Sequence, residues 1–248
     1  FGWCMTDYNT HREFGSGDRI SYQGVMDMFR NPKLSAAVYA SQKTPRSPSD
    51  IVLEISSSMA LGDHPGGFAG ACWAFTNAES LRLYRDNDFV AEFTPDRRGR
   101  FAALPHPPIE IQDFVGSLLE KYEGLDQSTA PQVAAILNEM RRDALNLSPL
   151  SRARMLSLRL SANDLLRMYY KYIGVLGGPS SVYRFEAVWH GRTVRTVVKE
   201  PVQSVRLECV VHNPILTDGP TWDCAAVSLR AIDQNGNLLP YCGEAVQL

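Results

Sequence analysis

The stretch "SLRLYRDNDFVAEFTP", residues 80–95, alternates apolar with polar side chains. A period of two residues is typical of half-buried β-strands, and Asp86 to Asp88 predicts a turn between the strands "LRLY" and "FVAEF". Two stretches upstream, "IVLEI" and "GACWAFTN", have the same strand character. We therefore expect an antiparallel β-sandwich.

A helical block follows these strands from about Ile109 to Ile173. Asp126 or Ser128 is expected to open a helix over "TAPQVAAILNEMRRDALNL", because short polar side chains cap helix N-termini. A later helix, "SANDLLRMYYKYIG", is expected to end at Gly174, since glycine readily adopts the left-handed backbone of a C-cap.

Strand character returns in "VYRFEAVWHGRTVRTVVKE", which predicts a hairpin that turns at His190-Gly191. The strands before the helices are too few to close a core by themselves. We therefore predict one immunoglobulin-like sandwich built from residues 45–106 and 180–203, with residues 107–179 as a helical insertion.

The last stretch, residues 204–248, predicts three more alternating strands, with turns at Asp218-Gly219 and Asn235-Gly236. A complete sandwich needs about seven strands. This stretch is therefore expected to be the start of a second immunoglobulin-like sandwich.

The chain begins with "FGWCMTDYNTHREFGSGD". The apolar run from Phe1 to Tyr8 predicts a buried strand, and a polar loop follows it. Residues 22–42 have apolar side chains near helical spacing, and Pro32 suits the first turn of a helix. Residues 1–44 thus have the order strand, loop, helix of a β/α unit, and "QKTPRSPSD" is typical of a linker to the sandwich.

The 248 residues are 44% hydrophobic and 21% charged, with a formal net charge of -2. This balance offers no broad basic surface for nucleic acid or anionic membranes, and no apolar run approaches the roughly 18 residues that cross a bilayer. The five cysteines lack the spacing of a zinc site or a disulfide framework. We expect no metal or cofactor, a neutral ligand, and a cytoplasmic location, with a secreted or periplasmic one left open.

Three motifs carry a family resemblance. "WCMTDYNTH" followed by "GSGDRISYQGVMDMFRNPKLSAAVYASQ" resembles the eighth strand, loop and eighth helix of the catalytic (β/α)8 TIM barrel of glycoside hydrolase family 2, in its β-galactosidase branch. "AFTNAESLRLYRDNDFVAEFTP" resembles the immunoglobulin-like domain that follows this barrel, and "DGPTWDCAAVSLRAIDQNGNLLP" resembles the start of a further sandwich. The resemblance implies a multi-domain α+β chain whose partners are a neutral β-hexoside and the remainder of the barrel.

In that family, Trp3 matches the aromatic platform beneath the sugar, at the C-terminal end of the last barrel strand. An indole stacks on the apolar face of a pyranose, and barrel active sites lie at that end of the strands. Asp7 matches an acidic position after this Trp, where a carboxylate either accepts from sugar hydroxyls or anchors the loop through backbone N–H groups. Asn9 and His11 follow in the polar loop at the barrel mouth, where each residue either binds sugar hydroxyls or maintains the structure of the loop.

One departure bears on the substrate. The β-glucuronidase branch grips the sugar carboxylate with an Asn-x-Lys pair, and here that stretch is Ser21-Tyr22-Gln23. Because Gln23 supplies no cation, the resemblance implies a neutral galactoside in preference to a uronide.

The family hydrolyses glycosides with retention through two glutamates about 5–5.5 Å apart, both on earlier barrel strands. No glutamate here takes their place, since Asn138-Glu139 imitates the family's Asn-Glu pair but lies in a helical pattern. The chain is therefore expected to be a C-terminal piece of a β-galactosidase-like hydrolase, without catalytic residues of its own. The alternative is a non-catalytic carbohydrate-binding or scaffold module with an exposed Trp73, Trp189 or Trp222 as its platform.

Overall fold

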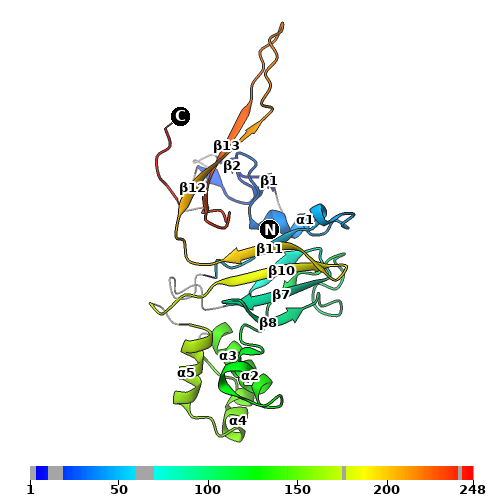
Figure 1. Cartoon of the computed structure of the whole chain (residues 1–248). Helices are drawn as coiled ribbons and strands as arrows, with labels where there is room; N and C mark the ends of the chain where they lie inside the picture. Colours follow the sequence, from blue (N-terminus) through cyan, green and yellow to red (C-terminus); the bar gives the residue numbers. More distant parts are fainter. Residues whose placement is uncertain are drawn as a thin grey trace.

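The computed structural model of the protein describes residues 4–10, 19–59, 70–143, 145–174, 177–239 and 242–247. Its elements form a mixed α+β chain, which confirms the expected fold class at that level. In Figure 1 a β-sandwich occupies the centre, helices α2 to α5 lie at one end, and a two-stranded ribbon extends from the other. Within the described residues, no helix has the length and apolar character needed to span a membrane.

The elements have the following bounds. The strands are β1 (Cys4–Thr6), β2 (Tyr8–Asn9), β3 (Ile20–Ser21), β4 (Gly24–Met26), β5 (Leu53–Ile55), β6 (Trp73–Thr76), β7 (Ser80–Arg85), β8 (Asp88–Phe93), β9 (Ile109–Glu110), β10 (Tyr183–Trp189), β11 (Arg192–Lys199), β12 (Val205–His212) and β13 (Ala226–Asp233). The helices are α1 (Leu34–Ala40), α2 (Leu118–Glu123), α3 (Ala130–Arg142), α4 (Pro149–Ser157) and α5 (Ala162–Tyr172), with a 3-10 turn, η2, at Pro48–Asp50.

Strands β7 and β8 form the first predicted hairpin, and β10 and β11 form the second. In each turn both central residues have a positive φ, which is 49° at Asp86 and 73° at Asn87, and 50° at His190 and 72° at Gly191. A two-residue turn of this kind has the twist that antiparallel strands require. Both predicted hairpins are confirmed.

The two hairpins join into one four-stranded sheet in the order β11-β10-β7-β8. Strand β10 pairs antiparallel with β7 from Tyr183↔Arg85 to Val188↔Ser80. Strands β5, β6 and β9 form a second, three-stranded sheet. The chain therefore leaves the larger sheet after β8, passes through β9 and the helices, and returns to pair with β7.

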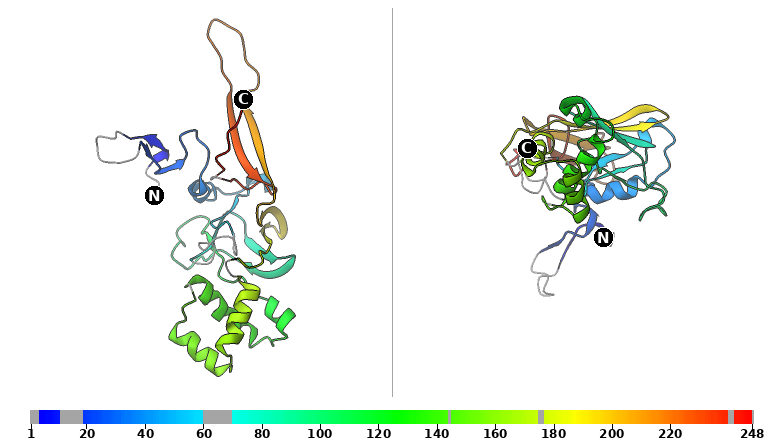
Figure 2. Two further views of the ribbon diagram at one scale, coloured as in Figure 1. Left: turned by 90° about the vertical axis from the view of Figure 1, so that its left-hand side faces the viewer. Right: turned by 90° about the horizontal axis from the view of Figure 1, so that it is seen from below.

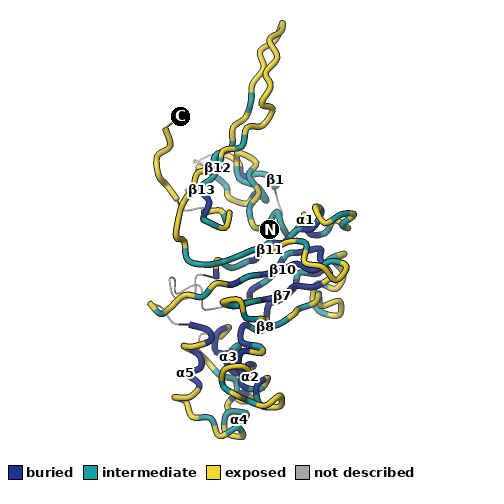
Figure 3. Tube along the Cα trace, in the orientation of Figure 1, coloured by how far each residue is buried: buried dark blue, intermediate teal, exposed yellow. Residues whose placement is uncertain are grey.

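One hydrophobic core runs through both sheets and the helices. It accounts for the alternation of apolar side chains in the strands, because each strand turns every second residue inward. Figure 3 shows this interior as buried, whereas β12 and the connection from β12 to β13 are mostly exposed. Fully buried side chains include Leu53, Leu81, Leu83, Ile136, Leu137 and Phe185.

Helix α5 begins at a capping serine, whereas the N-cap of α3 is Thr129 instead of the expected Asp126 or Ser128. In α5, Ser161 and Asp164 form a capping box, in which each side chain accepts a hydrogen bond from the other's backbone N–H. Helix α3 begins at Ala130, and the Asp126 carboxylate accepts from the N–H groups of Ser128 (2.8 Å) and Thr129 (3.0 Å) just before it. Asp126 thus organises the turn that starts α3.

The N-terminal helix is shorter than predicted. It begins at Leu34, and residues 24–26 form strand β4 instead. The Asp27 carboxylate accepts hydrogen bonds from the backbone N–H groups of Phe29 and Asn31, both at 2.8 Å. The prediction that the helix includes this stretch is wrong, because the side chain of Asp27 takes the N–H groups that a helix would use.

The described residues of the C-terminal stretch contain two strands, β12 and β13, where three were predicted. Asp218-Gly219 lies within the long connection between them, visible as the extended tip of the ribbon in Figure 2. The turn at Asn235-Gly236 is confirmed, since the Asp233 carboxylate accepts from the N–H groups of Asn235 (2.9 Å) and Asn237 (2.7 Å). After this turn, the described residues add only a single bridge, Ile232↔Leu238.

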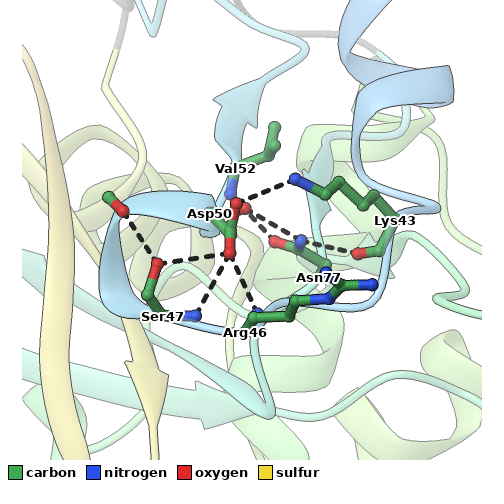
Figure 4. A network of polar contacts seen from close by, with 7 residues as sticks. Lys43, Arg46, Ser47, Asp50, Val52 and Asn77 are labelled. Carbon is green, nitrogen blue, oxygen red and sulfur yellow. Dashed lines mark hydrogen bonds and ion pairs between the residues drawn. The ribbon is translucent and has the colours of Figure 1, made fainter.

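The linker between α1 and the sandwich is an ordered corner (Figure 4). The Asn77 amide donates to the backbone oxygens of Lys43 (2.9 Å) and Asp50 (3.1 Å), and its Oδ1 accepts from the N–H of Val52 (2.8 Å). The Asp50 carboxylate accepts from the Lys43 ammonium (2.9 Å) and from the N–H of Arg46 (3.0 Å). These hydrogen bonds, that of Lys43 first, lower the pKa of Asp50 to about 2.

The Asp50 corner makes folding stability depend on pH. Because the pKa of Asp50 is lower in the folded chain than the value of about 4 in an unfolded chain, its contribution is present above about pH 4 and is lost as the pH falls through about 2. We expect Asp50→Asn to lower the urea midpoint of sandwich unfolding at pH 7, and this deficit to shrink at pH 3. Asp218→Asn, on the exposed tip of the ribbon, is the control. A deficit of equal size at both pH values would contradict the role given to Asp50.

Candidate functional site

Two of the four predicted sugar-site residues, Asp7 and Asn9, lie in the described part of the chain. Trp3 and His11 lie outside the described residues. Asp7 follows β1 directly, and Asn9 ends β2. The candidate site is therefore built here from the backbone and side chains around Asp7.

The segment around Asp7 consists of two small strand pairs. Strand β1 pairs in parallel with β4 through Cys4↔Gly24 and Thr6↔Met26. Strand β2 pairs antiparallel with β3, and the N–H of Thr10 donates to the carbonyl of Arg19 at 2.8 Å. The chain thus leaves β1, makes a polar hairpin and comes back alongside it.

Strand β1 is less buried than predicted. Its middle residue, Met5, is 72% exposed, while Cys4 and Thr6 on either side are half-buried. The reason is that β1 is paired with β4 alone in the described chain, in a two-stranded sheet. The prediction of a buried strand is therefore wrong for Cys4–Thr6 in this structure.

Gly24 is required by close backbone contact. A Cβ atom at this position would lie 2.2 Å from the backbone N of Asp7 and 2.3 Å from the carbonyl carbon of Thr6. Gly24 is buried, and as the first residue of β4 it pairs with Cys4 of β1. Only glycine lets the two parallel strands approach this closely.

Asp7 is the polar centre of the segment, and its side chain is only 4% exposed. Its Oδ1 accepts from the N–H of Gly24 at 2.9 Å and from the ammonium of Lys33 at 2.6 Å. Its own N–H donates to the carbonyl of Met26 at 2.9 Å. These contacts are those of a loop anchor, the second of the two roles that the sequence left open, and contact with a sugar stays a prediction.

Polar and aromatic side chains are exposed around this anchor. Asn9 and Gln23 are exposed, and Tyr8 and Tyr22 are 41% and 64% exposed. The Lys33 ammonium also donates to the carbonyl of Tyr22 at 3.1 Å. Its positive charge is therefore paired with the Asp7 carboxylate and hydrogen-bonded to the backbone. The arrangement offers hydrogen-bond groups and aromatic rings for a neutral ligand, without metal-like clustering of acidic side chains in the described segment.

The sequence pattern that imitates a catalytic pair, Asn138-Glu139, serves to fix helix α3. The Asn138 amide accepts from the N–H of Phe114 (3.0 Å) and donates to the Asp113 carboxylate (2.7 Å). Glu139 accepts from the Ser151 hydroxyl and from the N–H of Ser148 at the start of α4. Burial of its carboxyl raises the pKa, but these hydrogen bonds outweigh burial and lower it. These contacts agree with the interpretation of Asn138 and Glu139 as structural residues of a helix.

The three tryptophans of the alternative platform differ in exposure. Trp73 packs edge-on against Phe101, with ring centroids 5.6 Å apart, and Trp189 packs against the core. Trp222, in the connection between β12 and β13, is 86% exposed. Trp222 is thus the one of the three whose ring is open to solvent.

Comparison with known proteins shows similarity to β-galactosidases, as the resemblance implied. The chain is 43% identical over 112 residues to a β-galactosidase of Thermoanaerobacterium thermosulfurigenes, covering 44% of the chain and 15% of that protein. It is 29% identical over 240 residues to a β-galactosidase of Thermoanaerobacter pseudethanolicus, covering 97% of the chain and 25% of that protein. The chain therefore spans about a quarter of the length of the Thermoanaerobacter pseudethanolicus protein, and its matched part spans 15% of the Thermoanaerobacterium thermosulfurigenes protein. No family model matches the chain.

Among solved structures, the chain is similar to a β-glycosidase from Bacteroides vulgatus. The TM-score is 0.48 with 14% sequence identity, and the superposition covers 96% of this chain and 21% of that one.

Gly24→Ala is expected to open the β1–β4 pair. The added methyl group meets backbone atoms, so the strands must separate at a cost of about 1–3 kcal/mol, which corresponds to roughly tenfold or greater exposure of the segment. We expect trypsin to cut after Arg19 and Arg30 about ten times faster, with the sandwich sites unchanged. Gly219→Ala, where an added Cβ meets nothing within 4 Å, is the matched control. Cleavage at the wild-type rate would show that Gly24 is not needed for strand pairing.

Proposed function

We propose that this chain is part of a retaining glycosidase that acts on neutral β-D-galactosides. The observation that carries the proposal is the similarity to the Thermoanaerobacter pseudethanolicus β-galactosidase along 97% of the chain. The chain supplies part of the sugar-binding site and its supporting domains, and the two reacting glutamates belong to another part of the enzyme.

In this proposal residues 1–44 are the last β/α unit of a catalytic TIM barrel. Trp3 stacks on the sugar, and Asp7, Asn9 and His11 border it in the loop after the strand. Support comes from the order of elements, because β1 is followed directly by the buried Asp7 and then by the β2–β3 pair. The edge of β1 that is unpaired among the described residues is where the neighbouring barrel strand pairs.

The remaining division of the chain is proposed on the same basis. Residues 45–106 and 180–203 form one immunoglobulin-like sandwich, with residues 107–179 inserted, and the β7–β10 pairing supports this arrangement. Residues 204–248 begin a second sandwich. Support for this comes from the alternation of apolar and polar side chains in the β12–β13 ribbon. Among the described residues, no second sheet covers the apolar face of this ribbon, which includes Val205, Leu207, Val211 and Val227.

A second candidate function is a carbohydrate-binding module that uses the ribbon. The exposure of Trp222 favours it, together with that of Ile215 in the same connection, which is 82% exposed. A sugar platform needs an exposed ring, and Trp222 has one. The two functions differ in where sugar binds: loss of galactoside binding in Trp222→Ala alone supports the module, and loss in Trp3→Ala alone supports the glycosidase.

The isolated chain is expected not to hydrolyse aryl β-galactosides. Without the nucleophile and the acid/base glutamate, only weak positioning effects remain. The measurement is release of the aryl group by purified chain, beside a longer polypeptide that contains the barrel. Steady turnover by the chain alone, with contaminating enzyme excluded, would overturn the assignment of the glutamates to another part of the enzyme.

In the longer polypeptide, Trp3→Ala is expected to lower kcat/KM for a β-galactoside by roughly 10²-fold, or about 3 kcal/mol. The variant loses a stacking surface but no proton donor or nucleophile, so the pH profile keeps its shape. Gln23→Lys is the matched comparison and is expected to change galactoside kinetics little while giving slight binding of a glucuronide. Near wild-type efficiency of Trp3→Ala would place that indole outside the sugar site.

A further inference from the structure

Lys33 is held at both ends. Its backbone N–H donates to the carbonyl of Val25 in β4 at 3.2 Å, immediately before α1 begins. Its ammonium reaches Asp7 at 2.6 Å and the carbonyl of Tyr22 at 3.1 Å. One side chain thus ties together the end of β1, the approach to β4 and the start of α1.

Asp7 depends on this contact for its charge balance. Its side chain is 4% exposed, and a buried carboxylate is costly unless it is paired and hydrogen-bonded. Among the described residues, Lys33 is the basic side chain that forms an ion pair with Asp7, and its own side chain is 30% exposed. Removing the ammonium would leave a buried negative charge whose one remaining hydrogen-bond donor among the described residues is the N–H of Gly24.

We infer that Lys33 is a positioning residue for the sugar site, acting through Asp7. The effect of Lys33 on catalysis rests on the proposed function, whereas the ion pair between Lys33 and Asp7 is a feature of the structure. Asp7 stands between β1, which follows Trp3, and β2, which carries Asn9. By fixing Asp7, Lys33 sets the direction in which both site segments leave the strand pair.

The ion pair also sets the charge of the site. Lys33 and Asp7 neutralise each other beside the exposed Gln23 and Asn9, so their pair presents little net charge to a ligand. A neutral sugar therefore meets an Asp7 carboxylate and a Lys33 ammonium that already hold each other in place. Its binding does not leave either charge without a partner.

The first experiment tests the ion pair in the chain itself. Lys33→Met keeps the aliphatic stem and removes the ammonium. We expect hydrogen exchange of the Gly24 and Asp7 amides to become roughly tenfold faster, with the Leu83 amide in β7 unchanged. Lys33→Arg, which keeps the positive charge, is expected to retain most of the protection. Unchanged exchange at Gly24 in Lys33→Met overturns the inference.

The matched control is Lys43→Met. Lys43 also pairs with an aspartate, since its ammonium lies 2.9 Å from the Asp50 carboxylate, but that pair lies in the linker corner. This variant should leave the Gly24 and Asp7 amides at the wild-type exchange rate. Equal acceleration in both variants would show a general effect of lost charge and would also overturn the inference.

The second experiment uses the longer polypeptide and an aryl β-galactoside. We expect Lys33→Met to lower kcat and kcat/KM together by roughly tenfold, because the site is misaligned for the transition state, and Lys33→Arg to recover most of the loss. Faster exchange with unchanged kinetics overturns the positioning role. Absence of galactoside hydrolysis by the wild-type polypeptide instead overturns the proposed function, and leaves the result on the ion pair standing.

Discussion

The pairing of β7 with β10 is the contact on which the rest of the fold depends. It joins Ser80–Arg85 to Tyr183–Val188 across the whole helical block, so a long loop must close before the four-stranded sheet exists. Burial of side chains such as Leu83 and Phe185 offsets that entropy. The same junction fixes the helices, because the Arg85 guanidinium donates to the carbonyls of Lys171 (2.9 Å) and Tyr172 (2.6 Å) at the end of α5.

The sequence predicts this sandwich well because its signals are local. Alternating side chains mark the strands, and Asp86-Asn87 and His190-Gly191 provide the left-handed residues of the two hairpin turns. The C-terminal ribbon is predicted less well. A long connection replaces the tight turn expected at Asp218-Gly219, and nothing in the short-range pattern determines where its strands find partners.

The candidate site is predicted by residue type but not by contact. The family resemblance predicts a site role for Asp7, but the sequence does not indicate that Gly24 and Lys33 are its partners. Their roles depend on distances across the fold, namely the approach of Gly24 to Thr6 and Asp7, and the reach of the Lys33 ammonium. The buried Arg141 was likewise not predicted; its guanidinium lies 4.3 Å from the centre of the Phe114 ring, where it connects α3 to the sandwich side of the core.

We propose that sugar binds beside the segment that Asp7 and Lys33 hold, and not on the ribbon that carries Trp222. The most direct measurement is a crystal structure of the longer polypeptide in which a slow fluorinated galactoside has trapped the covalent glycosyl-enzyme. We expect the galactosyl ring to contact the Trp3 indole within about 4.5 Å. A ring bound away from Trp3, or stacked on Trp222, would contradict it.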